Sequence, residues 1–218
     1  MELKNKIAVF LGDSITEGVG ASSQEHVYHQ VLKKEYGLKE AVNYGISGTR
    51  IARQHKPSEW ESFDLDFCLR FPEMRDDADI VVVFGGTNDF GHGDALFGTL
   101  EDDTPDTYCG AVRFLMRGLL EKYPDSQIVF MTPLHRGGDE KVNYPDSPNK
   151  DRCLDDYRRV IIELARYYAI PVLDLYSVSG IQPNIPCIAE RYMPDGLHPS
   201  DRGNEKIASL LGHFLEQL

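Results

Sequence analysis

The sequence has few cysteines, and none of them is paired as a metal site or a disulfide framework requires. The four are Cys68, Cys109, Cys153 and Cys187, with no CxxC pair among them. Zinc sites and small secreted domains are typically built from closely spaced cysteines. Isolated thiols instead indicate buried, reduced side chains, so we expect a cytoplasmic protein.

Long apolar runs and an excess of positive charge are also missing. No run approaches the roughly 20 apolar residues that cross a bilayer. Residues 1–6 lead directly into a strand-like stretch, without the charged and apolar leader of a secreted protein. Lysines and arginines number 23 against 35 aspartates and glutamates, a net charge of −12. Because an acidic surface disfavours nucleic acid and anionic membranes, we expect neither a nucleic-acid partner nor stable membrane association. No pattern indicates an oligomeric state.

Motifs of several enzyme classes are absent. A classical α/β-hydrolase carries G-x-S-x-G, but here Thr16 stands two residues after Ser14, and the first glycine after it is Gly18. The GxxxxGK[ST] nucleotide-binding motif does not occur. Histidines and carboxylates are not spaced in the clusters that a metal-dependent phosphodiesterase requires. We therefore expect no metal and no other cofactor.

What the sequence does contain is a regular alternation of apolar segments and helix-like stretches. The apolar segments are residues 7–11, 41–44, 80–84, 127–131 and 171–175. Each is apolar along most of its length, which is typical of parallel strands buried on both faces. Helical spacing of apolar residues predicts helices at residues 25–36, 107–123, 150–168 and 201–218. No linker divides residues 1–218, so we expect one domain of class α/β, with three α/β/α layers and a doubly wound, parallel, five-stranded sheet.

The connections after the later strands are unusually long. Connections in compact α/β domains usually have about 2–6 residues, whereas residues 88–106, 133–149 and 176–200 all separate a strand from the next predicted helix. All three leave the carboxyl ends of their strands, where ligands bind in such sheets. Loops of this length on one edge predict a functional site there, although surface insertion without function is the alternative.

The candidate nucleophile at this edge is Ser14, which follows the first strand in Gly12-Asp13-Ser14. A serine nucleophile needs a base to take its proton and an acid to orient the base. His198 is the candidate base, and Asp195, three residues earlier, can reach its second ring nitrogen. The alternative role for Ser14 is to cap the following helix, because serine and aspartate are favoured N-caps.

Three candidate donors for an oxyanion follow three different strands. They are the backbone N–H groups of Ser14 and Gly48 and the side-chain amide of Asn88. Gly48 lets a backbone N–H approach closely, because no Cβ stands in the way. Three donors around one oxygen can form an oxyanion hole. The alternative is that Gly48 shapes a tight turn and that Asn88 caps one, and for Asp13 and Asp89 we favour a structural role.

Together these motifs resemble the four sequence blocks of the SGNH hydrolases, also called GDSL lipases and esterases. The blocks are Gly12-Asp13-Ser14-Ile15, Gly48, Gly86-Thr87-Asn88-Asp89 and Asp195-x-x-His198, in the family's order from the first strand to the last helix. The resemblance implies a flavodoxin-like sheet and hydrolysis of esters through a Ser–His–Asp triad and an acyl-enzyme. The three candidate oxyanion donors, Ser14, Gly48 and Asn88, lie in these blocks, and no catalytic position departs from the pattern.

The loops at the predicted site edge indicate a small polar ester as substrate. Candidate substrate contacts are His92, His135, Arg136 and Tyr192, and Phe63 is assigned only to packing at an edge of the sheet. Acidic residues recur in these loops, at Glu101, Asp102, Asp103, Asp139, Glu140 and Asp146, and no long apolar lid segment is present. We therefore expect a short acyl or acetyl group on a polar or carbohydrate alcohol.

Two other functions are consistent with the same fold. Leu134, Ile188 and Tyr192 could line a groove for a longer chain, as in a lipase, lysophospholipase or thioesterase of the same family. A flavodoxin-like module could instead use residues 14–18 as a phosphate loop for flavin mononucleotide. Such a module would be yellow and would not need Asp195 or His198.

Overall fold

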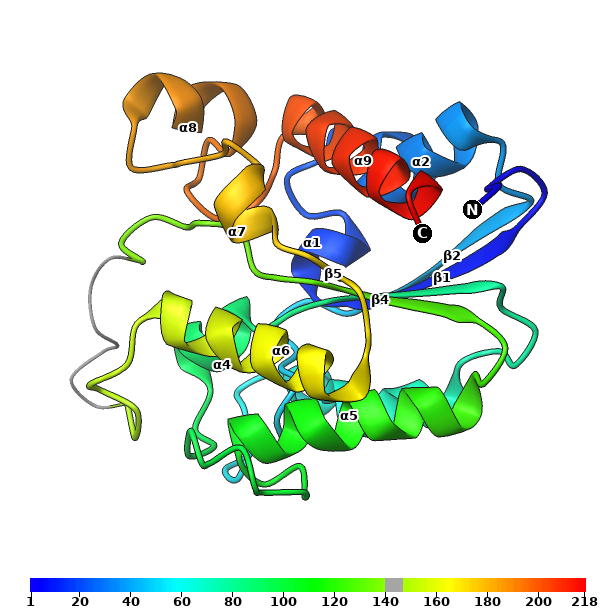
Figure 1. Cartoon of the computed structure of the whole chain (residues 1–218). Helices are drawn as coiled ribbons and strands as arrows, with labels where there is room; N and C mark the ends of the chain where they lie inside the picture. Colours follow the sequence, from blue (N-terminus) through cyan, green and yellow to red (C-terminus); the bar gives the residue numbers. More distant parts are fainter. Residues whose placement is uncertain (140–146) are drawn as a thin grey trace.

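The computed structural model describes residues 1–139 and 147–218 and confirms the predicted three-layer α/β/α fold (Figure 1). Within these residues, five parallel strands form one sheet in the order β2-β1-β3-β4-β5. The strands are β1 (Ile7–Gly12), β2 (Glu40–Gly45), β3 (Ile80–Phe84), β4 (Gln127–Met131) and β5 (Val172–Leu173). This is the flavodoxin-like strand order, with the central strands buried on both faces.

The register of the sheet brings the ends of the first three strands together. Gly12, the last residue of β1, pairs with Gly45 at the end of β2 and with Phe84 at the end of β3. In a parallel sheet, segments that follow aligned strand ends leave from one edge. The three motifs that follow β1, β2 and β3 therefore start side by side.

Two helical layers cover the sheet, one on each face, as Figure 1 shows. α2 (Tyr28–Tyr36) and α9 (Asp201–Glu216) pack on one face, and α3 (Phe67–Arg70), α5 (Tyr108–Lys122) and α6 (Leu154–Tyr168) pack on the other. Alternate residues of β1 enter the two cores, so that Phe10 faces α2 and α9 while Leu11 faces the opposite layer. This period of two explains why β1 reads as a continuous apolar run.

Local signals set where the helices begin and end. Thr107 Oγ1 accepts the N–H of Gly110 and caps α5, and Ser200 Oγ accepts the N–H of Gly203 and caps α9. Gly37 ends α2 in the left-handed conformation, with φ of 70°. The cap at Ser200 matters for the site, because it places the segment 195–199 directly ahead of α9.

Several predicted boundaries are wrong. The helix predicted at residues 25–36 begins only at Tyr28, after a 3₁₀ turn (Gln24–His26), and the helix predicted at residues 150–168 begins at Leu154. β5 has two residues because the Asp174 carboxylate binds Arg158 and Thr132, and α7 (Leu175–Val178) begins at the next residue. The polar side chain thus ends the strand earlier than the apolar pattern indicates.

The long connections contain short helices that the sequence did not predict. α4 (Thr87–His92) lies after β3, and α8 (Pro186–Tyr192) follows α7. The remaining elements are α1 (Ser14–Glu17) and the 3₁₀ turns Glu61–Asp64 and Phe71–Glu73. Of the acidic residues noted in the loops, Glu140 and Asp146 lie outside the described residues. No helix in residues 1–139 and 147–218 combines the length and the apolarity that a membrane crossing requires.

Candidate active site

Ser14 is the first residue of α1, but it does not cap the helix. The cap is Asp13, whose Oδ1 accepts the N–H of Ile15 at 3.0 Å. Gly12 allows the tight turn, because a Cβ there would overlap the side chain of Thr16. The alternative role considered for Ser14 is therefore filled by its neighbour, and the Ser14 hydroxyl is engaged elsewhere.

That hydroxyl lies next to the imidazole of His198, 184 residues further along the chain. Ser14 Oγ is 3.0 Å from His198 Nε2, and His198 Nδ1 is 2.7 Å from Asp195 Oδ2. Because a carboxylate only accepts, Nδ1 carries the proton and Nε2 is left to accept from the serine. The structure thus brings the three predicted catalytic residues into one line of hydrogen bonds.

Asp195 is fixed by its own loop. Its Oδ1 accepts the N–H groups of Leu197 and His198 at 2.8 and 2.7 Å. Partial burial raises the pKa of Asp195, but these bonds and the bond from the His198 ring outweigh it and hold the pKa below the ordinary value. The carboxylate is therefore ionised at neutral pH and orients the imidazole.

Gly48 and Asn88 lie on two segments that contact each other. Gly48 has φ of 74°, and a Cβ at this position would overlap the ring of Phe63, so only glycine fits without strain. Asn88 lies in the first turn of α4, and its Nδ2 donates one hydrogen to the Thr49 carbonyl at 3.0 Å. An amide nitrogen carries two hydrogens, so a second remains for another acceptor.

Asp89 ties the same two segments together. Its buried carboxylate accepts the N–H groups of Ile51 and Ala52 at 3.0 and 2.9 Å. Burial raises the pKa of Asp89 to about 6, although these two bonds oppose the shift. Burial also raises the pKa of the neighbouring Asp13 to about 7, with a smaller contribution from the charge of Asp89. The bond from Ile15 to Asp13 and the bonds from the 51–52 backbone to Asp89 agree with the structural role that we expected for these two aspartates.

Arg70 has a role at this edge that we did not predict. Its guanidinium donates to the carbonyls of Gly12 and Tyr44, at the ends of β1 and β2, and to Thr49 Oγ1. Burial lowers the pKa of Arg70 to about 10, although Asp13 and Asp66 favour its charged form. The only sequence signal was a charged residue inside the apolar stretch Phe67–Phe71.

Of the candidate substrate contacts, His92 and Arg136 lie near the proposed oxyanion donors. His92 is exposed and lies on α4, one turn after Asn88. Arg136 Nη1 donates to the carbonyl of Thr87 at 3.1 Å, and its guanidinium lies 5.7 Å from the ring centroid of Phe90. His92 therefore belongs to α4, and Arg136 contacts it.

The other two candidates are held by contacts within the protein. His135 Nδ1 lies 2.6 Å from Asp139 Oδ2, and its ring stacks on Tyr176 with centroids 3.6 Å apart. The ring of Tyr192 packs toward α9, where Lys206 Nζ lies 4.9 Å from its centroid. For His135 and Tyr192 a role in substrate binding stays a prediction that these contacts do not strengthen.

One further contact joins two of the long loops. The N–H of Gly137, in the loop after β4, donates to the carbonyl of Gly196 at 2.7 Å. Gly196 has φ of 77° and lies between Asp195 and His198. The turn that carries the acid and the base is thus supported by the loop of a different strand.

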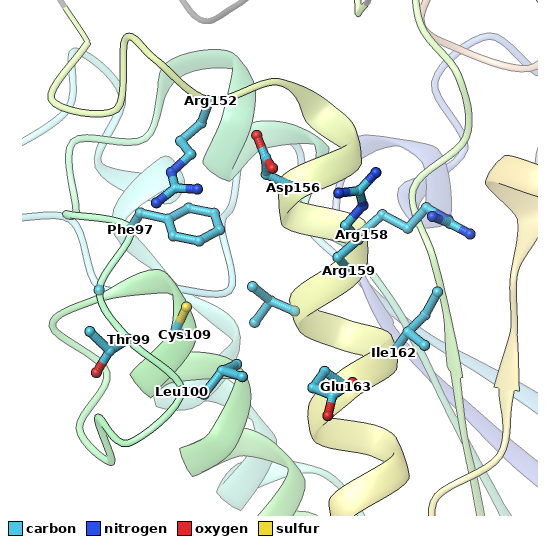
Figure 2. Close-up of a pocket in the computed structure, with 12 residues that line it drawn as sticks. Phe97, Thr99, Leu100, Cys109, Arg152, Asp156, Arg158, Arg159, Ile162 and Glu163 are labelled. Carbon is cyan, nitrogen blue, oxygen red and sulfur yellow. The ribbon is translucent and has the colours of Figure 1, made fainter.

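A separate pocket lies away from these residues. It has a volume of about 570 Å³ and lies between α5, α6 and the segment 97–100. Figure 2 shows Arg152 beside the ring of Phe97 at this pocket, and the guanidinium carbon lies 4.4 Å from the ring centroid. Its lining includes neither Ser14 nor His198, so it is distinct from the candidate active site. Nowhere in residues 1–139 and 147–218 are three His, Cys, Asp or Glu side chains grouped as a metal site requires.

Comparisons with known proteins show the family and the fold of the chain. A model of the GDSL-like lipase/acylhydrolase family matches residues 10–206. A Lactobacillus plantarum protein of known structure is 31% identical, with 98% of each chain covered and a TM-score of 0.83. A lipase/acylhydrolase from Enterococcus faecalis is 20% identical, with 97% of this chain and 96% of that chain covered and a TM-score of 0.64, and shows the shared fold. No curated protein matches this chain.

Proposed function

Because this chain belongs to the GDSL-like lipase/acylhydrolase family and is a hydrolase that acts on ester bonds, we propose that it cleaves carboxylic esters through a triad of Ser14, His198 and Asp195. One observation carries the proposal. Ser14 Oγ, the His198 ring and the Asp195 carboxylate are joined by contacts of 3.0 and 2.7 Å. A nucleophile, a base and a group that orients the base are the parts that serine catalysis needs.

In the proposed reaction, His198 Nε2 takes the Ser14 proton as Oγ bonds to the carbonyl carbon of the ester. The carbonyl π electrons move to oxygen, and a tetrahedral intermediate forms. When it collapses, the bond to the alcohol oxygen breaks and that oxygen takes the proton from His198, leaving an acyl group on Ser14. Water then repeats both steps, with His198 as base and then acid, and releases the carboxylic acid.

The negative oxygen of the intermediate needs donors that are already in place. We assign this role to the backbone N–H groups of Ser14 and Gly48 and to the second hydrogen of Asn88 Nδ2. The proposal is supported by the bond from Asn88 to Thr49, because it fixes the amide beside the Gly48 turn. A donor held in place before reaction stabilises the transition state without reorganisation.

For the substrate, we propose a short acyl group, such as acetyl, on a polar alcohol. The support is the presence of polar side chains with N–H groups at the same edge, Asn88 and His92 among them. The acidic loops support a polar alcohol less than the sequence indicated. Asp102 binds Thr99 and Thr107 in the turn before α5, and Asp139 binds His135, so both carboxylates are already engaged by other side chains of the protein.

The test is hydrolysis of p-nitrophenyl esters from acetate to palmitate by the wild type and by Ser14→Ala. We expect turnover that depends on Ser14 and is highest for acetate and butyrate. Activity that peaks at long chains would replace the short-chain proposal with a lipase, lysophospholipase or thioesterase activity. Equal activity in Ser14→Ala would contradict the triad. No activity on any ester, together with yellow purified protein, would favour the flavin-binding alternative.

A further inference from the structure

α4 carries a second polar side chain beside the proposed oxyanion donor. Asn88 and His92 are four residues apart in a helix that spans Thr87–His92. Residues with this spacing are neighbours on one helix face. Asn88 is buried, whereas His92 is exposed. His92 therefore lies at the surface next to the position where we place the carbonyl oxygen of the ester.

The contact with Arg50 determines which ring nitrogen of His92 carries the proton. Arg50 Nη1 lies 2.8 Å from His92 Nδ1. A guanidinium only donates, so Nδ1 accepts, and the single proton of the neutral ring is on Nε2. Arg50 is itself held in place, because its side chain is 2% exposed and its Nη2 donates to Ser58 Oγ and to the Phe63 carbonyl. His92 thus offers an N–H donor at its second nitrogen.

Partial burial, together with nearby positive charges, keeps the His92 ring neutral. Loss of water around part of the ring, together with the positive charges of Arg50 and Arg136, lowers the pKa of His92 to about 4. At neutral pH the ring is a neutral donor. A neutral donor suits a hydroxyl or ether oxygen, and the nearby guanidinium groups disfavour a cationic group.

Phe63 adds an apolar surface to the same place. Its ring lies against the Cα of Gly48, as the overlap with a Cβ there shows, and its centroid is 5.8 Å from that of His92 with an interplanar angle of 36°. Phe63 is half-buried, so part of the ring is accessible. Phe63 and His92 together combine an aromatic face and one hydrogen-bond donor, and they border both Gly48 and Asn88.

We propose that Phe63 and His92 bind the alcohol part of the ester and that this alcohol is polyhydroxylated, as in a sugar. A sugar ring has an apolar C–H face that can pack on Phe63 and hydroxyl oxygens that can accept from His92 Nε2. An acetyl group has no oxygen apart from the ester itself, so the acceptor for His92 comes from the alcohol. This inference rests on the proposed function, because it assumes that Gly48 and Asn88 surround the ester carbonyl.

The test compares two acetyl esters, 6-O-acetylglucose and p-nitrophenyl acetate, which differ in the alcohol. The variant is His92→Phe, which keeps an aromatic ring against Phe63 and removes the donor. We expect the ratio of kcat/KM for 6-O-acetylglucose to that for p-nitrophenyl acetate to fall roughly ten-fold, about the effect of one lost hydrogen bond. Most of the change should be in KM. His92→Gln, which restores an N–H donor, should recover part of the ratio.

His213→Phe is the matched control, because His213 is an exposed histidine of α9 that binds the carbonyl of Ser209. It should leave both rates unchanged. An unchanged ratio in His92→Phe would overturn the inference, as would a wild type that cleaves p-nitrophenyl acetate but not 6-O-acetylglucose. Both results would leave the esterase proposal intact if turnover still depends on Ser14. Turnover that survives in Ser14→Ala would instead reject the proposed function.

Discussion

The Asp89 carboxylate accepts the backbone N–H of Ala52 at 2.9 Å, and this bond joins the start of α4 to the segment that follows Gly48. A second bond, from Ile51, reinforces it. We expect Asp89→Ala to lower the free energy of unfolding by about 2–4 kcal/mol, because it leaves two buried N–H groups without an acceptor. Urea unfolding measures this, with the exposed Asp125→Ala as control. Equal midpoints for Asp89→Ala and the control would contradict it.

Removal of the Asn88 amide should affect the chemical step. If its second hydrogen binds the oxyanion, Asn88→Ala should lower kcat by roughly 10²–10³ with little change in KM, because the donor acts in the transition state. Steady-state kinetics on p-nitrophenyl acetate measure both constants. Circular dichroism checks that the fold is retained, since the bond to Thr49 is also lost. A kcat within a factor of three of the wild type would exclude Asn88 as a donor.

Ser14 and His198 should act as one unit. We expect Ser14→Ala and His198→Ala each to lower kcat by several orders of magnitude, and the double variant to be no slower than the slower single variant. The reason is that neither the nucleophile nor the base has a function without the other. Independent losses that multiply in the double variant would show that the two residues do not cooperate.

His29 should make stability depend on pH between about 4 and 6.5. The ring is fully buried and contacts the Thr16 carbonyl through Nε2 at 3.0 Å. Burial lowers its pKa to about 4, although the contact with Thr16 opposes the shift. His29 therefore takes up a proton near pH 6.5 in the unfolded chain but only near pH 4 in the folded protein. The stability from His29 is fully present above pH 6.5 and falls by about 3 kcal/mol as the pH drops to 4.

The measurement compares the wild type with His29→Gln by urea unfolding at several pH values. A difference between the two is needed because Asp13 and Asp89, whose pKa values are raised, change stability in the opposite direction over the same range. The advantage of the wild type should shrink as the pH falls. An advantage that is the same at pH 4 and pH 7 would show that His29 takes up its proton at the same pH in the folded and the unfolded protein.

The sequence predicted those parts of the fold that depend on strand burial and chain order. Continuous apolar runs identified β1, β3 and β4, because strands buried on both faces have no polar side to interrupt them. The candidate residues at Ser14, Asp195 and His198 were found by the same logic, since each lies just after a strand or just before a helix. Their contacts in the structure agree with that placement.

Other parts could not be predicted, because they depend on contacts between distant residues. Arg70 acts through carbonyls at the ends of two strands, and no sequence pattern marks a half-buried arginine as a link between strands. The contact of Phe63 with Gly48 and His92 joins three segments whose relative placement only the folded chain defines. The short helix α4 was assigned to a loop because its six residues, fewer than two turns, include a glycine and four polar side chains.

The span of 184 residues between Ser14 and His198 also has a consequence for folding. The serine lies two residues after β1, at the start of α1, whereas the turn that carries the histidine precedes α9, which packs on α2. Sheet formation alone can place the serine, but the histidine reaches it only when the C-terminal helix has docked. During refolding from denaturant, the regain of esterase turnover should therefore lag behind the regain of β-sheet signal and report the arrival of that helix.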